Sequence, residues 1–354
     1  MKVLSGVDIP VDEKDFNLRW LFLPEISVLM SVYNSEKYVK EAINSILNQT
    51  YGNFEFIVVN DGSNDNTGQI IKDFFNKDNR IQFISRTENK GIGYSLNEAW
   101  YAAQGDFIAL MDDDDISHPN RFARQISQLQ TSNIDILGTY VEVFGQAVDE
   151  QKTRIQTKLN LPIDSVNAAE VFLTYWHCFA KPSVMMKRKV LEELRGFKNR
   201  TAEDYDLWMR AIRHGFKIGK LPEKLLKCRI RHNSATKVLN RDLGGIADAI
   251  NIKLTYLADI IKNKIKRYLI WGTGSGGEIT RKALSIDLPQ AELIGYLDNY
   301  KEGFFNGNPI YKSTQISELS FDYIFIATEP GKEEAIKILR TLGLENIKDF
   351  LCTV

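Results

Sequence analysis

Short apolar runs rich in β-branched residues alternate with amphipathic stretches between Ile26 and about Asp112, and this alternation is the strongest constraint on the fold. In order, the segments are ISVLMSVY, EKYVKEAINSILNQ, FEFIVVN, TGQIIKDFFN, IQFIS, GYSLNEAWYAA and DFIALM. Runs of this length and composition are typical of strands, and strands that alternate with helices form mostly parallel sheets. The pattern therefore predicts an α/β domain.

Polar side chains follow three of these predicted strands at the point where each strand ends. They are Tyr33 and Asn34, the sequence NDGS at 60–63, and the four consecutive aspartates Asp112, Asp113, Asp114 and Asp115. In open parallel sheets, ligands bind beyond the carboxyl ends of the strands. We therefore expect the three sets to converge on one cleft.

The aspartate run suggests a cation site. Four like charges held together repel one another, which raises the pKa of some members and favours a hard cation with oxygen ligands. The alternative is a solvated acidic loop followed by a helix cap, in which Ser117 and Pro119 precede the helix RFARQISQLQ. The run by itself fits both interpretations, and its neighbours favour the cation.

The strand ends together offer what a nucleoside diphosphate needs. A uracil-like base can stack on Tyr33 and donate its imide N–H to Asp61, while a cation on the acidic run neutralises the two phosphates. The alternative for Asp61 is an Asx turn that caps a helix starting near Asn64.

Composition narrows the class of protein. The 354 residues suffice for one large and one small domain, and 45 Lys and Arg against 46 Asp and Glu argue against a basic face for nucleic acid. Cys178, Cys228 and Cys352 have no metal-ligand spacing, so we expect reduced thiols. The N-terminus lacks an apolar signal core, and no uncharged apolar run could span a bilayer, which predicts a cytoplasmic protein.

The C-terminal third predicts a connector and a second α/β unit. The segment LGGIADAINIKLTYLADIIKNKIKR is predicted to be one long helix, either packed between two domains, as we favour, or in peripheral contact with an anionic membrane. From Tyr268, a strand, a glycine turn with Gly272, Gly274 and Gly277, and a helix fit GxGxxG, with Asp298 further on. About 85 residues make half of a dinucleotide-binding domain, so we favour a docking or homo-oligomerisation module over a nucleotide site.

Several motifs together resemble the family 2 glycosyltransferases, which have the GT-A fold, from Ile26 to about Ser234. They are SVLMSVYNSEKYVKEAINSILNQTY, FEFIVVNDGSNDNT, ENKGIGYSLNEAW, DFIALMDDDD and AEDYDLWMR. The resemblance gives the predicted organisation: an N-terminal extension (1–24), a GT-A domain (25–240), a helical linker (241–266) and a smaller Rossmann-like domain (267–354).

The resemblance also implies residue roles. The nucleoside of a UDP-sugar would be held by Ser31, Tyr33, Asp61, Asn89 and Lys90. Asp112 and Asp114 correspond to the acids of the DXD motif: the first commonly contacts the ribose, and the last binds Mn²⁺ or Mg²⁺ through the diphosphate. Asp113 lies between them in the donor site. Four acids in a row leave this assignment open by one residue.

Glu203 and Asp204 resemble the family's ED pair, whose aspartate deprotonates the acceptor hydroxyl. Asp204 is expected in the first turn of its helix, where the dipole favours the ionised form, with Trp208 one turn later. The alternative is a carboxylate that only stabilises the helix. His232 would reach the metal or the diphosphate, or else be a surface histidine.

One departure from the family pattern concerns a His-Pro-Ser stretch found in many relatives. This chain has Ala180, Lys181, Pro182 and Ser183 there, so Lys181 is expected to alter acceptor or sugar recognition, and His177 lies nearby but out of register.

The expected function is inverting, metal-dependent transfer of a sugar to a hydroxyl of a glycan or lipid-linked oligosaccharide in bacterial surface polysaccharide synthesis. A nucleotidyltransferase is the first alternative, but no basic glycine-rich loop follows the first predicted strand. The second is a sensor that binds a nucleotide sugar through the C-terminal domain. A dehydrogenase is disfavoured because nothing beside the glycine turn offers a hydride-transfer site.

Overall fold

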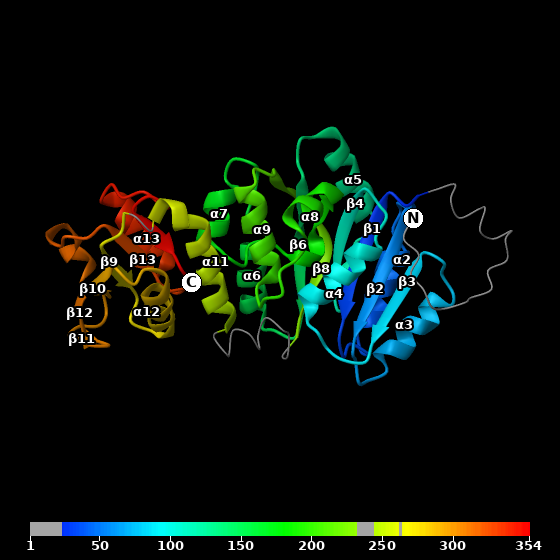
Figure 1. Cartoon of the computed structure of the whole chain (residues 1–354), viewed down its shortest axis with the longest axis horizontal. Coiled ribbons are helices and arrows are strands. Elements are labelled where there is room, and N and C mark those ends of the chain that lie inside the picture. The colour runs from blue at the N-terminus through cyan, green and yellow to red at the C-terminus, as the bar shows by residue number, and fades with distance from the viewer. Residues whose placement is uncertain (1–22, 232–243, 262–263) are drawn as a thin grey trace.

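The computed structural model describes residues 23–231, 244–261 and 264–354. These residues form an eight-stranded sheet and a six-stranded sheet, each with its own covering helices. The two units lie side by side along the long axis of the molecule, with helix α11 between them (Figure 1). The expected α/β class is confirmed.

The first sheet begins as a parallel α/β sheet and then changes direction. Its strand order is β3-β2-β1-β4-β7-β6-β8-β5. The parallel part consists of β1 (Ile26–Val32), β2 (Phe54–Asp61), β3 (Ile81–Arg86) and β4 (Phe107–Asp112). The remainder consists of β5 (Ile116–Ser117), β6 (Ile136–Gly145), β7 (Met185–Lys187) and β8 (Ile218–Ile230). Because β7 pairs antiparallel with β4, the aspartates at the end of β4 lie beside the point where the sheet changes direction.

Helices cover both faces of this sheet, and the strands are apolar because both faces are buried. Val28 and Met30 contribute to one core, and Leu29 between them to the other, as the period of a strand requires. The helices are α2 (Val39–Leu47), α3 (Thr67–Phe75), α4 (Ile92–Ala102), α5 (Arg121–Thr131), α6 (Asp149–Leu159), α7 (Ala168–Thr174), α8 (Arg188–Leu194) and α9 (Glu203–Arg213). A short 3₁₀ turn, η1 (Lys181–Ser183), precedes β7.

The second unit is a smaller sheet of order β11-β12-β10-β9-β13-β14, parallel apart from the β11–β12 pair. Its elements are β9 (Arg267–Trp271), α12 (Ser275–Asp287), β10 (Glu292–Leu297), β11 (Phe304–Phe305), β12 (Asn308–Tyr311), η2 (Ser313–Glu318), β13 (Tyr323–Ile326), α13 (Lys332–Thr341) and β14 (Phe350–Cys352). A Cβ on Gly277 would lie 2.1 Å from the Gly272 carbonyl oxygen, so close helix–strand packing already requires that glycine.

Helix α11 (Gly244–Ile261) joins the two units. It packs against α9 on one side and α12 on the other, and one apolar core runs through all three helices. The Asp248 carboxylate accepts hydrogen bonds from Arg200 Nε at 2.9 Å and from the Ala202 backbone N–H at 2.9 Å, just before α9. In the part of the chain that the structure describes, no helix is long and apolar enough to cross a bilayer.

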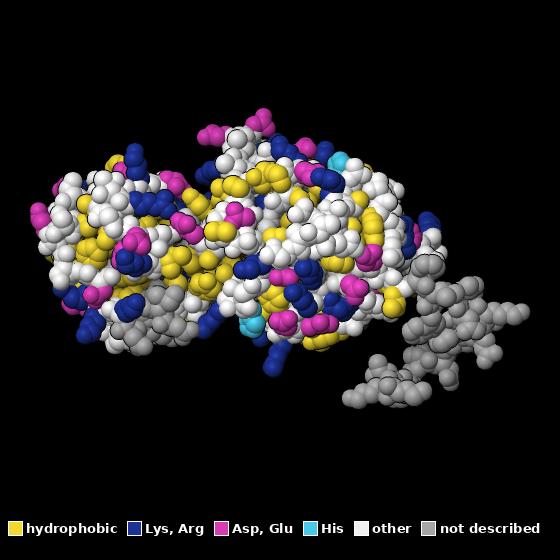
Figure 2. Space-filling view, turned by 90° about the horizontal axis from the view of Figure 1, so that it is seen from above, with side chains coloured by type: hydrophobic (Ala, Val, Ile, Leu, Met, Phe, Trp, Pro, Cys, Tyr) yellow, Lys and Arg dark blue, Asp and Glu magenta, His cyan; other side chains and the backbone are white. Residues whose placement is uncertain are grey.

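The units also touch through polar side chains. Tyr175 Oη donates to Glu333 at 2.6 Å, and Lys158 pairs with Glu329. Figure 2 shows basic and acidic side chains intermingled over the face that it displays, with hydrophobic side chains gathered where the lobes meet. That face carries no continuous basic patch.

Candidate active site

The carboxyl ends of β1, β2 and β4 converge, as the sequence predicts. Ser31 on β1 is the strand partner of Asp112 on β4. The Tyr33 backbone N–H lies 3.4 Å from Asp113 Oδ2, and the Ser35 hydroxyl donates to the Asp113 carbonyl at 3.2 Å. The Tyr33 side chain is exposed, so its ring is free to receive a planar ligand.

Asp61 is buried at the end of β2 and is joined to the ENKGIG turn. Its two carboxylate oxygens accept the backbone N–H groups of Lys90 and Gly91, each at 2.9 Å. The alternative Asx-turn role belongs to the preceding residue, because the Ser63 N–H donates to Asn60 Oδ1. Asp61, Lys90 and their neighbour Asn89 therefore lie together.

Arg86, at the end of β3, is a residue that the sequence analysis missed. Its guanidinium lies 3.3 Å from Asp61 and 3.0 Å from Glu98, and it covers the Tyr94 ring at 4.9 Å. Its position in the sequence could have predicted its role, because Arg86 stands at the end of a strand, as the acidic residues of the site do. Arg86 fixes the Asp61 side chain and screens its charge.

The structure divides the four aspartates into two groups. Asp112 pairs with Lys181 at 3.1 Å, and Asp114 pairs with Arg231 at 2.5 Å. Asp113 lies 3.6 Å from the same guanidinium. Asp115, which is buried like Asp114, accepts the Arg229 backbone N–H at 2.7 Å instead of pairing with a basic side chain. Asp112, Asp113 and Asp114 therefore face basic side chains, whereas Asp115 accepts a backbone N–H.

Burial makes this acidic cluster electrostatically unfavourable by itself. Burial, followed by the charge of Asp114, raises the pKa of Asp113 to about 7, although Arg231 opposes the shift. Burial also raises the pKa of Asp114, and that of Asp115 well above its usual range. Carboxylates that resist ionisation in this way gain from a nearby cation.

The donor chemistry fits Mn²⁺ or Mg²⁺, since both prefer carboxylate oxygens. Among the described residues, however, no three His, Cys, Asp or Glu side chains gather around one point, and Lys181 and Arg231 already pair with two of the acids. His232, the other predicted ligand, lies outside the described residues.

The predicted base lies in the first turn of α9. Asp204 Oδ1 accepts the Tyr205 backbone N–H at 2.7 Å, and Trp208, one turn later, is buried against Phe179. Burial raises the pKa of Asp204, and the charge of Lys181 opposes that shift. Glu203, beside it, has its pKa raised to about 7 by burial.

Lys181 connects the two acidic centres. Its Nζ lies 3.1 Å from Asp112 and 3.3 Å from Glu203, so the aspartate run and the ED pair lie on the two sides of one ammonium group. Although burial lowers the pKa of Lys181, the carboxylates of Asp112 and Glu203 raise it above its ordinary value. His177 lies elsewhere, at the contact between the two units, where burial lowers its pKa to about 4.

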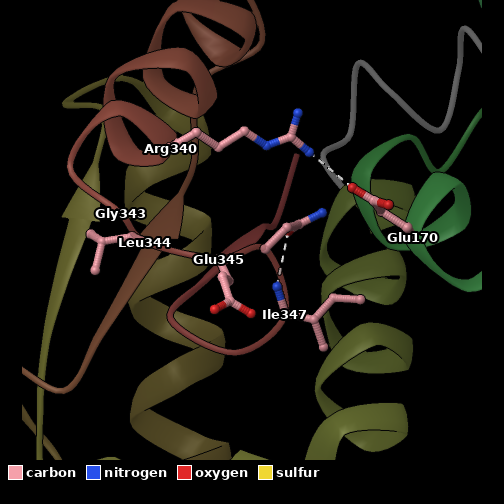
Figure 3. Close-up of a pocket in the computed structure, with 7 residues that line it drawn as sticks. Glu170, Arg340, Gly343, Leu344, Glu345 and Ile347 are labelled. Atoms are coloured by element: carbon pink, nitrogen blue, oxygen red, sulfur yellow. Dashed lines mark hydrogen bonds and ion pairs between the residues drawn. The ribbon is translucent and has the colours of Figure 1, made fainter.

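A separate open pocket, with a volume of about 430 Å³, lies at the contact between α7 and the C-terminal unit (Figure 3). Arg340 reaches across it to Glu170 at 2.9 Å, and residues 343–347 form its other wall. None of the predicted site residues lines it. The acidic cleft, and not this cavity, is therefore the candidate active site.

Two family models match the chain, each over a different part. Residues 27–195 match the family model "Glycosyl transferase family 2", and residues 264–348 match the model "C2185-like, N-terminal". The uncharacterised glycosyltransferase MJ1057 of Methanocaldococcus jannaschii is 35% identical over 226 residues, which cover 62% of this chain and 76% of that protein. The O-antigen biosynthesis glycosyltransferase WbnJ of Escherichia coli is 33% identical over 61% of this chain and 83% of that protein.

Solved structures share the fold. S. aureus TarS in complex with UDP-GlcNAc matches with a TM-score of 0.53 and 20% identity, over 76% of this chain and 82% of that one. Together with the architecture described above, these likenesses confirm the expected fold and family. The chain belongs to glycosyltransferase family 2, with a GT-A domain followed by a smaller α/β domain.

Proposed function

We propose that this glycosyltransferase moves a sugar from a UDP-sugar to a hydroxyl acceptor, with inversion and with the help of Mn²⁺ or Mg²⁺. The observation that carries the proposal is the contact of one ammonium group, Lys181 Nζ, with both Asp112 and Glu203. Donor-binding acids and a base must face the same substrate, and a lysine that contacts both Asp112 and Glu203, the neighbour of Asp204, supports that arrangement. We also propose the domain bounds 25–240, 241–266 and 267–354.

The donor end of the cleft suits a uridine nucleotide. The exposed Tyr33 ring can stack on the base, and Asp61 is held rigidly by two backbone N–H groups. Oδ1 also lies 3.3 Å from Arg86, whereas Oδ2 accepts the Gly91 N–H and has a second lone pair with which Asp61 can accept an imide N–H. Ser31, Asn89 and Lys90 complete the nucleoside site in this proposal. The TarS complex with UDP-GlcNAc supports this choice of donor.

Asp114 and Asp112 would hold the metal, with His232 as a further ligand. When bound, the ion supplies Lewis-acid stabilisation of the leaving diphosphate. Asp113 and Arg231 lie against the same edge, where Arg231 neutralises charge that would otherwise repel the phosphates.

Asp204 removes the proton of the acceptor hydroxyl while the bond between sugar and nucleotide breaks, a single displacement that inverts the anomeric carbon. Burial raises its pKa, although the charge of Lys181 opposes the shift, and the raised pKa makes Asp204 a stronger base than a solvated aspartate. The helix N-terminus that carries it keeps the ionised form available.

The acceptor belongs to bacterial surface polysaccharide synthesis, as a glycan or lipid-linked oligosaccharide met by the protein in the cytoplasm at the inner face of the membrane. The name of one relative supports this part, since WbnJ is an O-antigen biosynthesis glycosyltransferase. We assign the C-terminal domain to docking, because its glycines Gly272 and Gly277 are already explained by backbone packing.

The experiment is a donor screen on the full chain with Mn²⁺ and a panel of UDP-, GDP- and dTDP-sugars, with thermal stability and nucleotide release measured in parallel. Donor-dependent release of UDP, absent from an Asp204→Asn variant, is the expected result. Pyrophosphate release would instead indicate nucleotidyl transfer. Stabilisation by a nucleotide sugar without turnover would indicate a sensor and overturn the proposal.

A further inference from the structure

Hydrogen bonds hold the backbone that carries Lys181 in place. Its turn, η1, is held by α5: Gln125 Nε2 donates to the Ser183 carbonyl at 2.9 Å, and the Arg121 guanidinium donates to the Pro182 carbonyl. The Val184 N–H closes the turn onto the Lys181 carbonyl at 3.0 Å. The lysine therefore extends from a fixed backbone into the cleft.

The ammonium group pairs with carboxylates on two separate elements. Asp112, at the end of β4, lies 3.1 Å away, and Glu203, at the start of α9, lies 3.3 Å away. The charge of Asp204 also acts on it. Because Lys181 and Glu203 are both more than nine-tenths buried, water screens these interactions weakly.

Without this cation, the partly exposed Asp112 at the end of β4 and the buried Glu203 at the start of α9 would present like charges to each other. Like charges of which one is buried separate or take up protons. The first response would move the base away from the donor-binding edge, and the second would inactivate it. Either change would impair proton transfer, for which a displacement of about 1 Å can cost roughly 10²-fold in rate.

We propose that Lys181 is a positioning residue for the transfer reaction: it ties the donor-binding edge at Asp112 to the α9 turn that carries the base Asp204. This inference rests on the proposed function of the cleft and adds a residue to it. The lysine acts through the two carboxylates and need not touch either substrate. This positioning role also explains why a permanent cation suits position 181, since a lysine stays charged throughout the pH range in which a histidine would titrate.

The test compares Lys181→Met, which keeps the approximate length and removes the charge, with Lys181→Arg, which keeps the charge. Lys220→Met is the matched control, because Lys220 is a partly buried lysine of the same domain that donates only to carbonyls, those of Leu159, Leu161 and Cys178. Each variant is characterised by melting temperature, by UDP affinity with Mn²⁺, and by kcat against pH with the donor found in the screen.

We expect Lys181→Met to lower kcat by about 10- to 100-fold while UDP affinity stays within about threefold. The acid limb of its kcat profile should move up by about one pH unit, because an opposite charge near the base is lost. Lys181→Arg should recover most of kcat and restore the limb. Lys220→Met should lower the melting temperature and leave the profile of kcat unchanged.

Equal losses in Lys181→Met and Lys181→Arg, or a Lys181→Met profile that coincides with the wild type, would overturn the proposal. If Lys181→Met does not fold, Glu203→Gln decides: it removes the carboxylate through which Lys181 contacts the start of α9, and it should lower kcat while UDP affinity stays unchanged. An unchanged kcat in that variant also refutes the tie. These outcomes all require an active wild type, whereas a wild type that releases no nucleotide refutes the proposed function itself.

Discussion

Asp204 and Asp206 lie two residues apart on α9 and should respond to the same substitution in opposite ways. In Asp204→Asn, the side-chain carbonyl can still accept the Tyr205 N–H that now lies 2.7 Å from Oδ1. Only the ability to take a proton is lost. A positioned base typically contributes ~10²–10⁴-fold, or about 2.7–5.4 kcal/mol of barrier, so kcat should fall by that factor.

The stability of Asp204→Asn should not fall together with its kcat. Burial raises the folded-state pKa of Asp204 above its unfolded value, so the folded protein binds the proton more tightly between the two values. Stability therefore decreases as pH rises through that window, and ionised Asp204 is a net cost above it. Because asparagine carries no charge, the variant should melt at or above the wild-type temperature at pH 8.

Asp206→Asn should show the reverse. Asp206 accepts from Arg200 at 2.9 Å and from Arg210 at 2.6 Å. Losing two charge-assisted hydrogen bonds of about 1.5 kcal/mol each, partly screened by water, should cost about 2–3 kcal/mol. That corresponds to a fall of roughly 4–12 °C in melting temperature, with kcat of the folded protein unchanged.

The assay is release of UDP in the presence of acceptor, together with differential scanning calorimetry on both variants. Near-normal transfer by Asp204→Asn would refute the assignment of the base. A loss of kcat in Asp206→Asn as large as that in Asp204→Asn would also refute it, because the effect would then belong to the helix and not to one carboxylate.

Three further predictions concern the donor site and the domain contact. Chelation by EDTA should abolish the rise in melting temperature caused by UDP, and Mn²⁺ should restore that rise. Asp114→Asn should weaken both Mn²⁺-dependent UDP binding and kcat by at least about tenfold. Calorimetric titration measures the UDP affinity, and an affinity that EDTA does not change would contradict the metal-dependent donor site. Tyr33→Ala should weaken UDP binding by about threefold to tenfold through lost stacking, whereas Tyr101→Ala, at an exposed position on α4, should leave it unchanged. Burial, followed by the charge of Lys158, lowers the pKa of His177 to about 4, so the contribution of neutral His177 to stability is complete above pH 6.5 and is lost as pH falls towards 4. His177→Gln should therefore flatten the dependence of melting temperature on pH in that window. Melting curves of wild type and variant with the same pH dependence would show that His177 does not titrate there.

The parts of the fold that depend on local pattern could be predicted from the sequence. The alternation of apolar runs gives β1 to β4 and their helices because both periods, that of the strand and that of the helix, are set by neighbouring residues. The helix over RFARQISQLQ and the one that begins at Glu203 were likewise predicted, and the latter ends before Gly215, which has a φ of +86°. The aspartates follow β4 as expected.

The contacts that build the site could not be predicted, because they join segments distant in the sequence. Consecutive aspartates look alike, and only the Arg229 N–H on β8 shows that Asp115 is committed to the interior. Arg231, which pairs with Asp114, was missed for the same reason. Lys181 was noticed only as a departure from the family pattern, and its contact with both acidic centres depends on the antiparallel insertion of β7 next to β4.

The contact between Asp248 and the segment before α9 means that the catalytic unit does not end where its sheet ends. A chain shortened to residue 240 would keep every strand of the larger sheet, yet it would leave Arg200 and the Ala202 N–H without their carboxylate acceptor. Those two groups precede the turn that presents Asp204. Chimeras that graft this transferase onto another tail should therefore be joined after Ile261, where the whole connector travels with the enzyme.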